Sequence, residues 1–281
     1  MIYKNIKLLA IVSVLLLSSL FSQQVIVTAN EITVNNDEQL LAHYPLIEDV
    51  KDVSGHEKHG ETVGNITFAE GLTLPGGTNS NTNYVKLPDG LFDHQDSLTI
   101  STWLKSNTGS GNYSALFFGT QANSNNVPEN YWLFNPTNPS GNFKSVFTNS
   151  KNSSAPWSTE VGVTSANTTA NHGKWTHYTT VITPTTVTGY VNGEKIGTVN
   201  KTRTTSDFGT GLNSYIGRSN YVNDHTFAGS FQDLRIYGEA LNDINVSNVY
   251  ETSSNQFLLQ EDKKNLNLGD TTAVTGNLTL P

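Results

Sequence analysis

The sequence has 281 residues, and its 24 acidic residues against 16 basic ones give a formal net charge of −8. A chain of this charge without a block of basic residues has nothing to pair with a phosphate backbone, so we expect no nucleic-acid partner. The sequence contains no cysteine, which excludes disulfides, thiolate catalysis and cysteine-based zinc sites. Aromatic residues make up 10% of the chain, and a chain this long and this aromatic is expected to fold around a core.

The N-terminus has the pattern of an export signal. Lys4 and Lys7 precede an apolar run over residues 8–21, which is shorter than a bilayer crossing requires. The small residues at 27–29 are of the kind that signal peptidase prefers before its cleavage site. We therefore predict a signal peptide at 1–29, with an uncleaved membrane anchor as the alternative. The mature protein is expected to be secreted, extracellular or at the cell surface, with no membrane contact after cleavage.

Residues 40–250 carry the alternation of apolar and polar residues that is typical of half-buried strands. The clearest single strand covers residues 98–104. The clearest hairpin joins 186–191 to 194–199 through Asn192-Gly193, a pair that accepts the left-handed backbone of a type I′ turn. Further strands are predicted at 84–87, 115–118, 131–134, 143–147, 175–182, 214–216 and 227–237.

One short C-terminal helix is predicted at 239–250, because Leu241, Ile244 and Val249 share one of its sides. Strands do not alternate with long helices, which argues against a parallel α/β fold. We therefore predict an all-β sandwich or jelly roll that forms a single domain. The division of the chain is a lead-in at 30–39, the β-domain at 40–253 and, at 254–281, a charged linker followed by either a disordered end or the first strand of a further domain.

The motifs of known enzymes are weak in this sequence. A glycosidase needs two carboxylates that flank the scissile bond, and on a sheet these come from alternate positions of one strand. No strand offers such a run: Asp233 and Glu239 are too far apart in register, and Glu160, Glu194 and Glu251 are isolated beside turns. A Ser-His-Asp triad cannot be judged from spacing, but there is no Gly-x-Ser-x-Gly elbow. We therefore predict a protein that is not an enzyme.

Two carboxylates could hold a metal ion. Asp52 lies in the Gly-containing loop Asp52-Val53-Ser54-Gly55, and Asp233 lies in the last long strand, where carboxylates are disfavoured. Calcium takes six to eight oxygen ligands, so a loop from the N-terminal part that crosses a C-terminal strand could form a cage for it. The alternative is that Asp52 caps a turn and that Asp233 pairs with Arg235 or Arg218.

Aromatic residues in polar loops form a candidate ligand site. A sugar ring has an apolar face that packs on Trp or Tyr, while its hydroxyls need polar partners. Two loops, 123–130 and 221–225, supply both kinds of side chain, and Trp157 lies in a polar loop beside Pro156. The predicted carbohydrate-binding residues are Trp157, Trp132, Tyr131, Tyr221, His225 and Asn130.

An ordered series of motifs over residues 40–250 resembles the LamG-like jelly-roll family of the concanavalin A-like lectin/glucanase superfamily. The resemblance implies a two-sheet antiparallel jelly roll, often with a structural calcium, for which Asp52 and Asp233 would be the ligands. It also implies attachment to secreted bacterial enzymes that act on glycans. The motifs that carry the resemblance are Leu41-Ala42-His43-Tyr44-Pro45-Leu46, the loop 52–60, Tyr84-Val85-Lys86-Leu87-Pro88, the strand 98–105, Trp175-Thr176-His177-Tyr178, Gly189-Tyr190-Val191-Asn192-Gly193, Tyr215-Ile216-Gly217-Arg218-Ser219 and the strand 227–237.

The last residues, 266–281, resemble the opening of a bacterial immunoglobulin-like domain, which implies that the chain ends at the start of a further module. Such domains follow these jelly rolls in arabinan- and xylan-directed glycosidases of the family 43 type. We therefore predict a secreted, non-catalytic carbohydrate-binding or accessory module that binds a polysaccharide or glycan as a monomer. The alternatives are a cell-surface adhesion or protein-interaction domain, and a fragment of a family 43 glycosidase that lacks its catalytic domain.

Overall fold

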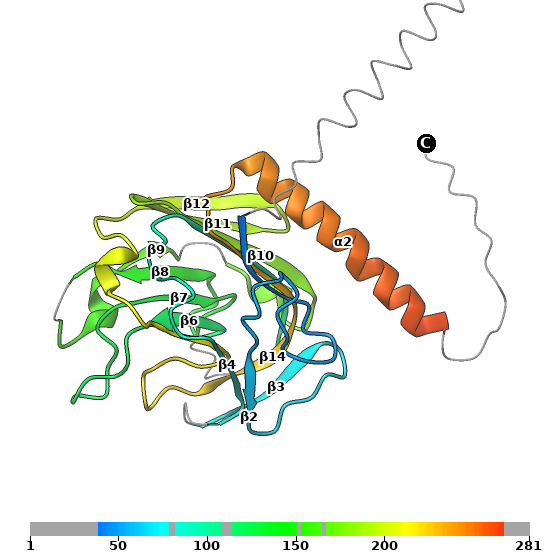
Figure 1. The fold of residues 1–281 in the computed structure, drawn as a ribbon, viewed down its shortest axis with the longest axis horizontal. Coiled ribbons are helices and arrows are strands. Elements are labelled where there is room, and N and C mark those ends of the chain that lie inside the picture. Colours follow the sequence, from blue (N-terminus) through cyan, green and yellow to red (C-terminus); the bar gives the residue numbers. More distant parts are fainter. Residues whose placement is uncertain (1–38, 79–81, 108–113, 151–152, 165–166, 267–281) are drawn as a thin grey trace, which may run out of the picture. The chain divides into compact units, whose positions relative to one another are not determined.

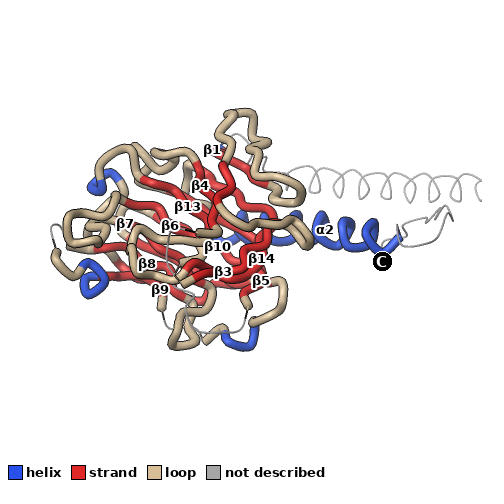
Figure 2. The backbone as a smooth tube through the Cα atoms, turned by 90° about the horizontal axis from the view of Figure 1, so that it is seen from below, coloured by secondary structure: helices blue, strands red, loops and turns tan. Residues whose placement is uncertain are grey.

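The computed structural model describes residues 39–78, 82–107, 114–150, 153–164 and 167–266, with side chains described to residue 257. The predicted signal peptide and residues 267–281 of the stretch that resembles an immunoglobulin-like domain lie outside these ranges. The described chain forms two antiparallel sheets, which lie as two layers with the short helices in the connecting loops (Figures 1 and 2). No helix of the described residues is both long enough and apolar enough to cross a membrane.

Sheet A contains the hairpin and the first and last strands of the domain. Its strands follow the order β1-β14-β5-β10-β11-β12, and β3 pairs with β14. Because β1 pairs with β14, the two ends of the domain lie side by side. The strands are β1 (Leu40–Tyr44), β3 (Leu72–Gly77), β5 (Leu98–Ser106), β10 (Thr176–Ile182), β11 (Thr186–Val191), β12 (Glu194–Asn200) and β14 (Thr226–Tyr237).

Sheet B follows the order β2-β4-β13-β6-β7-β8-β9. Its strands β6, β7, β8 and β9 are consecutive in the chain and are neighbours in the sheet. The strands are β2 (Glu61–Val63), β4 (Tyr84–Leu87), β6 (Leu116–Gly119), β7 (Tyr131–Asn135), β8 (Lys144–Thr148), β9 (Glu160–Val163) and β13 (Asn213–Ile216).

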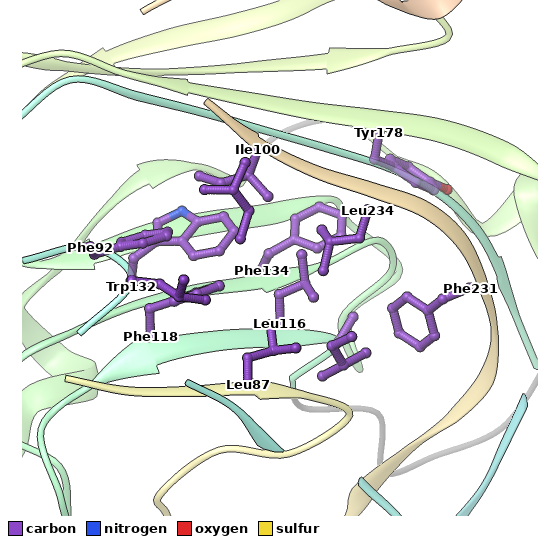
Figure 3. Packing of buried hydrophobic residues seen from close by; sticks show 14 of the residues in the cluster. Leu87, Phe92, Ile100, Leu116, Phe118, Trp132, Phe134, Tyr178, Phe231 and Leu234 are labelled. Carbon is purple, nitrogen blue, oxygen red and sulfur yellow. The ribbon is translucent and has the colours of Figure 1, made fainter. Parts of the chain in front are cut away.

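The core lies between the two sheets. Side chains of one strand alternate between the two faces, so every second residue points inward. Ile100 and Leu234 of sheet A meet Leu116 and Phe134 of sheet B in this layer (Figure 3). Phe92 stacks on Phe118 with ring centroids 3.9 Å apart. The predicted all-β fold, with two antiparallel sheets and a C-terminal helix, is confirmed.

The predicted hairpin has the expected turn. Asn192 and Gly193 have φ angles of 50° and 78°, the left-handed values that a type I′ turn requires at both central positions. Thr186–Val191 pairs with Glu194–Asn200 across it.

The C-terminal helix is longer than predicted. Helix α2 (Asp243–Leu266) has 24 residues, so the stretch 260–264 that was predicted as a charged linker is helical. The helix continues because Tyr250, Ser253 and Phe257 recur at a spacing of three to four residues and contact Trp103 on sheet A. Short 3₁₀ segments described in the loops are η2 (Pro156–Thr159), η3 (Thr169–Asn171) and η4 (Ser206–Phe208).

Candidate carbohydrate-binding pocket

The outer face of sheet B carries a second apolar layer. Strand alternation turns Phe117, Tyr131 and Leu133 away from the core, and Val146 and Tyr215 join them to form a buried cluster. Tyr221, in the loop between β13 and β14, packs against this cluster. This apolar outer face gives side chains from the neighbouring loops a surface to pack against.

A pocket of about 400 Å³ opens beside this layer and is called the outer pocket below. Its floor comes from adjacent strands and its walls from two loops that are distant in the sequence. The lining residues are Leu133 of β7, Lys144 of β8, Glu160 of β9, Trp157 of η2, and Tyr221 and Asp224 of the loop before β14.

Trp157 forms the exposed wall of the outer pocket. Its side chain is 53% exposed, although the adjacent Pro156 is buried and begins the 3₁₀ turn. The indole contacts the Tyr221 ring at 6.0 Å between centroids and at 66° between planes. An indole held by a tyrosine edge and open to solvent presents an apolar face of the kind that packs on a sugar ring.

A chain of hydrogen bonds fixes the back of the pocket. The Tyr221 hydroxyl donates to the Tyr131 hydroxyl at 3.0 Å, and the Tyr131 hydroxyl donates to Glu160 Oε1 at 2.8 Å. The other oxygen of Glu160 pairs with Lys144 Nζ at 2.6 Å. Burial raises the pKa of both tyrosines, and the Glu160 charge raises them further, so both stay neutral donors. The carboxylate of Glu160 is therefore held in place from two sides.

Asp224 faces the same pocket from the opposite loop. The Ser219 hydroxyl donates to its carboxylate at 2.8 Å, and the same hydroxyl accepts the backbone N–H of Tyr221 at 3.1 Å. Burial raises the pKa of Asp224, while the Ser219 bond and the Lys144 charge act in the opposite direction. The pocket thus contains two carboxyl groups and one ammonium group, a lining that does not attract an anionic ligand.

Two of the predicted ligand residues, Trp157 and Tyr221, line the outer pocket. Tyr131 lies behind it: its side chain is 0% exposed, and it acts by holding Tyr221 and Glu160. Asn130 and His225 do not line the pocket, and Asn130 Oδ1 accepts a hydrogen bond from Arg203 Nη1 at 2.8 Å.

The prediction of Trp132 as a ligand residue is corrected. Its side chain is 1% exposed and lies in the core, beside Phe118 (Figure 3). Its Nε1–H donates to Ser145 Oγ at 2.9 Å, so the polar atom is satisfied inside the protein. The reason is strand alternation: Tyr131 points outward, so its neighbour must point inward.

The sequence reasoning missed three polar residues of the pocket. The sequence shows Glu160 only as an isolated residue beside a turn, and Lys144 and Asp224 are not among the predicted ligand residues. Lys144 and Glu160 are 16 positions apart in the sequence and meet only because β8 pairs with β9. The sequence feature that points to Glu160 is Tyr131, because a buried tyrosine hydroxyl needs a hydrogen-bond acceptor such as a carboxylate.

The two predicted calcium ligands are satisfied by protein donors. Asp52 Oδ1 accepts the backbone N–H groups of His43 and Ser54, and Oδ2 accepts the Ser54 hydroxyl and the N–H of Lys58, all at 2.9–3.0 Å. Burial alone would raise the pKa of Asp52, but these bonds hold it below its usual value. Asp52 thus fixes its own loop through Ser54 and Lys58 and ties that loop to strand β1 through His43.

Asp233 lies on a β-bulge, where its φ angle is 52°, and is bonded through one carboxylate oxygen. Its Oδ1 accepts from His43 Nε2 at 2.6 Å and from Arg235 Nε at 2.9 Å. His43 thus bridges Asp52 and Asp233, through its backbone and its ring. Within the described part of the chain, no three His, Asp or Glu residues are grouped as a metal site would need. With both of its oxygens occupied by protein donors, Asp52 does not fit a calcium cage, which requires six to eight oxygen ligands.

The two-sheet fold and a match to a family sequence model identify the class of protein. The chain belongs to the concanavalin A-like lectin/glucanases superfamily, since the Laminin_G_3 family pattern matches residues 79–247, more than half of the sequence. A search among curated proteins gives no match.

Solved structures show the same fold. Domain 4 of AbnA, a GH43 extracellular arabinanase from Geobacillus stearothermophilus solved in complex with arabinotriose, is 22% identical with a TM-score of 0.57, over 75% of this chain and 98% of that domain. The binding domain of botulinum neurotoxin DC, solved in complex with rat synaptotagmin II, is 17% identical with a TM-score of 0.57, over 77% of this chain and 52% of that one. The predicted likeness to LamG-like domains and to a domain of a family 43 enzyme is confirmed. This chain spans about half of the toxin binding domain.

Proposed function

We propose that this protein is a secreted, non-catalytic carbohydrate-binding module of a glycan-degrading system. The observation that carries the proposal is the outer pocket, in which the exposed indole of Trp157 stands opposite hydrogen-bonding side chains. Trp157 supplies a stacking surface, while Glu160, Asp224 and Lys144 supply acceptors and a donor for hydroxyl groups.

The charges of the pocket favour a neutral glycan. Lys144 is already paired with Glu160 at 2.6 Å, so it offers no unpaired cation to a uronic acid or a sialic acid. Asp224 adds a second carboxyl group, and the whole chain carries a net charge of −8. A neutral pentose or hexose chain avoids the repulsion that an acidic chain would meet.

The same contacts support a binding role rather than catalysis. A glycosidase needs one carboxylic acid that gives up its proton and one carboxylate free to act on the substrate. Glu160 is tied to Lys144 and Tyr131, and Asp224 to Ser219. The likeness to a domain that was solved with arabinotriose supports an arabinan or a related polysaccharide as the first ligand to test.

The test is retention of the purified chain in native gels that contain arabinan, xylan or, as an acidic comparison, polygalacturonate. We expect retention by a neutral polysaccharide and a loss of affinity of about tenfold or more in Trp157→Ala, because a stacked ring contributes on the order of 1–2 kcal/mol. Ile244→Ala is the matched control, since Ile244 is also an exposed apolar residue but lies on α2.

Failure of every polysaccharide to retain the chain would contradict the proposal. The second candidate is then an adhesion or protein-interaction domain, which the likeness to the binding domain solved with synaptotagmin favours. Turnover of a polysaccharide by the purified chain would instead contradict the non-catalytic role.

A further inference from the structure

The outer face of sheet A is covered by helix α2 (Figure 1). Trp103 of β5 and His177 of β10 are opposite each other in neighbouring strands and share this face. From the helix, Tyr250 contacts both rings, at 5.9 Å from Trp103 and 5.6 Å from His177, and Phe257 stacks on Trp103 at 4.9 Å. The histidine is thus enclosed between a strand and the helix.

His177 is buried without any hydrogen-bond partner. Its side chain is 1% exposed, and neither ring nitrogen has a partner among the described residues. The hydroxyls of Ser101 and Thr179, which lie opposite each other on the same two strands, are also buried and unpaired. An unpaired buried polar group costs on the order of 1–3 kcal/mol, so this interface is less stable than an apolar one of the same area.

The two halves of α2 are attached by different contacts. Val246 and Val249 pack in an apolar cluster with Val181 of sheet A. Beyond Tyr250 the contacts are aromatic and polar: Phe257 packs on Trp103 and Trp175, Trp103 Nε1 donates to Ser253 Oγ at 3.1 Å and Arg235 Nη2 donates to Gln256 Oε1 at 3.0 Å. A cavity of about 190 Å³ remains beside Trp103 and Phe257. The second half is therefore held by aromatic and polar contacts beside a cavity, and not by an aliphatic cluster.

Protonation of His177 would weaken this attachment. Burial lowers the pKa of His177 to about 4; Asp233 of β14 opposes this shift and Arg235 of β14 adds to it. The nearby carboxylate of Asp233 is already bonded to His43 of β1. Tyr250 of α2 packs against the His177 ring, and neither ring nitrogen has a hydrogen-bond partner, so a proton added to His177 finds no acceptor. Because the pKa is lower when the helix is docked, docking is favoured fully above about pH 6.5. As the pH falls from 6.5 towards 4, the equilibrium constant for docking of the helix decreases by roughly tenfold per pH unit.

We propose that residues 250–257 of α2 form a cover over β5 and β10 that protonation of His177 releases on acidification. The first turns of the helix, around Val246, stay docked through their apolar contacts. Release exposes the Trp103 indole together with the unpaired hydroxyls of Ser101 and Thr179. Release of residues 250–257 is independent of the outer pocket, which lies on sheet B.

The experiment is hydrogen exchange on the full chain between pH 7 and pH 5, corrected for the intrinsic pH dependence of exchange. We expect protection of amides 250–257 to fall by about tenfold or more over this range. Protection of 243–249 and of the core strand Tyr131–Asn135 should be unchanged. His177→Leu should abolish the pH dependence, whereas His56→Gln, which removes an exposed histidine, should retain it.

Corrected protection of 250–257 that is constant with pH would overturn the proposal, and so would a pH dependence that His177→Leu retains. If that variant does not fold, the titration of the His177 ring in the unmodified chain by NMR decides. A pKa near 4 for the docked state supports the cover, and an ordinary value near 6.5 contradicts it.

Discussion

At the scale of single residues, two tryptophans that looked alike in the sequence have opposite roles. Trp132 is enclosed in the core, while Trp157 stands in solvent at the rim of the outer pocket. We expect Trp132→Ala to lower the free energy of unfolding by about 3–5 kcal/mol, since it leaves a large cavity. Trp157→Ala should change it by less than about 1 kcal/mol. Urea denaturation of both variants measures the difference, and equal stabilities would show that the assignment of the two rings is wrong.

Asp233 gives a second prediction at this scale. Burial would raise its pKa, but the bonds from His43 and Arg235 hold the pKa below its usual value. A carboxylate with a lowered pKa contributes stability above its unfolded value near 3.9 and loses it as the pH falls through the folded value. Asp233→Ala should therefore cost about 3 kcal/mol at pH 7, because it leaves the buried Arg235 guanidinium without a carboxylate partner, and less as the pH drops below about 4. Denaturation at pH 7 and pH 3 checks this, and a cost that does not depend on pH would argue against an ionised Asp233.

At the scale of elements, the β11–β12 turn and helix α2 depend on each other. A Cβ atom at Gly193 would come within 3.0 Å of the Tyr250 ring, and the φ angle of 78° is already unfavourable for alanine. Gly193→Ala should lower the melting temperature by more than Gly173→Ala, where φ is 71° but no atom lies within 4 Å. The control shares the backbone strain of about 1–2 kcal/mol and lacks the contact. Equal effects of the two variants would mean that Tyr250 does not rest on the turn.

Most elements could be predicted from the sequence because their patterns are local. The strand Leu98–Ser106 and the hairpin at Asn192 follow from alternation and turn chemistry alone. The strands at Glu61–Val63, Leu72–Gly77 and Glu160–Val163 were missed. The first and last have only three and four residues, and the second contains a proline and two glycines, so their pairing partners rather than their own patterns define them. The turns of α2 at residues 250–257 likewise have their contacts on Trp103.

At the scale of the whole molecule, the ends of the domain are joined by hydrogen bonds. His43 connects Asp52 of the first loop to Asp233 of the last strand, in the place where the resemblance had implied calcium. We expect neither excess calcium nor a chelator to shift the melting temperature, because protein donors occupy both oxygens of Asp52, and Asp233 is held by His43 and Arg235. Thermal melts with EDTA and with added calcium are the check. A chelator-dependent decrease that Asp52→Asn removes would show that the two carboxylates do hold an ion.

The candidate site shows why a binding pocket is harder to predict than a fold. Two aromatic members, Trp157 and Tyr221, could be chosen from composition, since an aromatic residue in a polar loop has little reason to be buried. Glu160 and Asp224 could not, because the pairing of β8 with β9 and the path of the loop before β14 bring them together. The same tertiary pairing decided that Tyr131 faces outward and Trp132 inward.

The most direct test of the account is an NMR titration of the tryptophan indoles with neutral oligosaccharides, beginning with arabinotriose. The chain has four tryptophans, and two of their indole N–H groups, in Trp103 and Trp132, are bonded to serine hydroxyls inside the protein. We expect the Trp157 indole signal to shift in a saturable way, while the indole signals of Trp103 and Trp132 do not shift. Titrations in which no neutral oligosaccharide shifts Trp157, or in which only the other indoles respond, would contradict it.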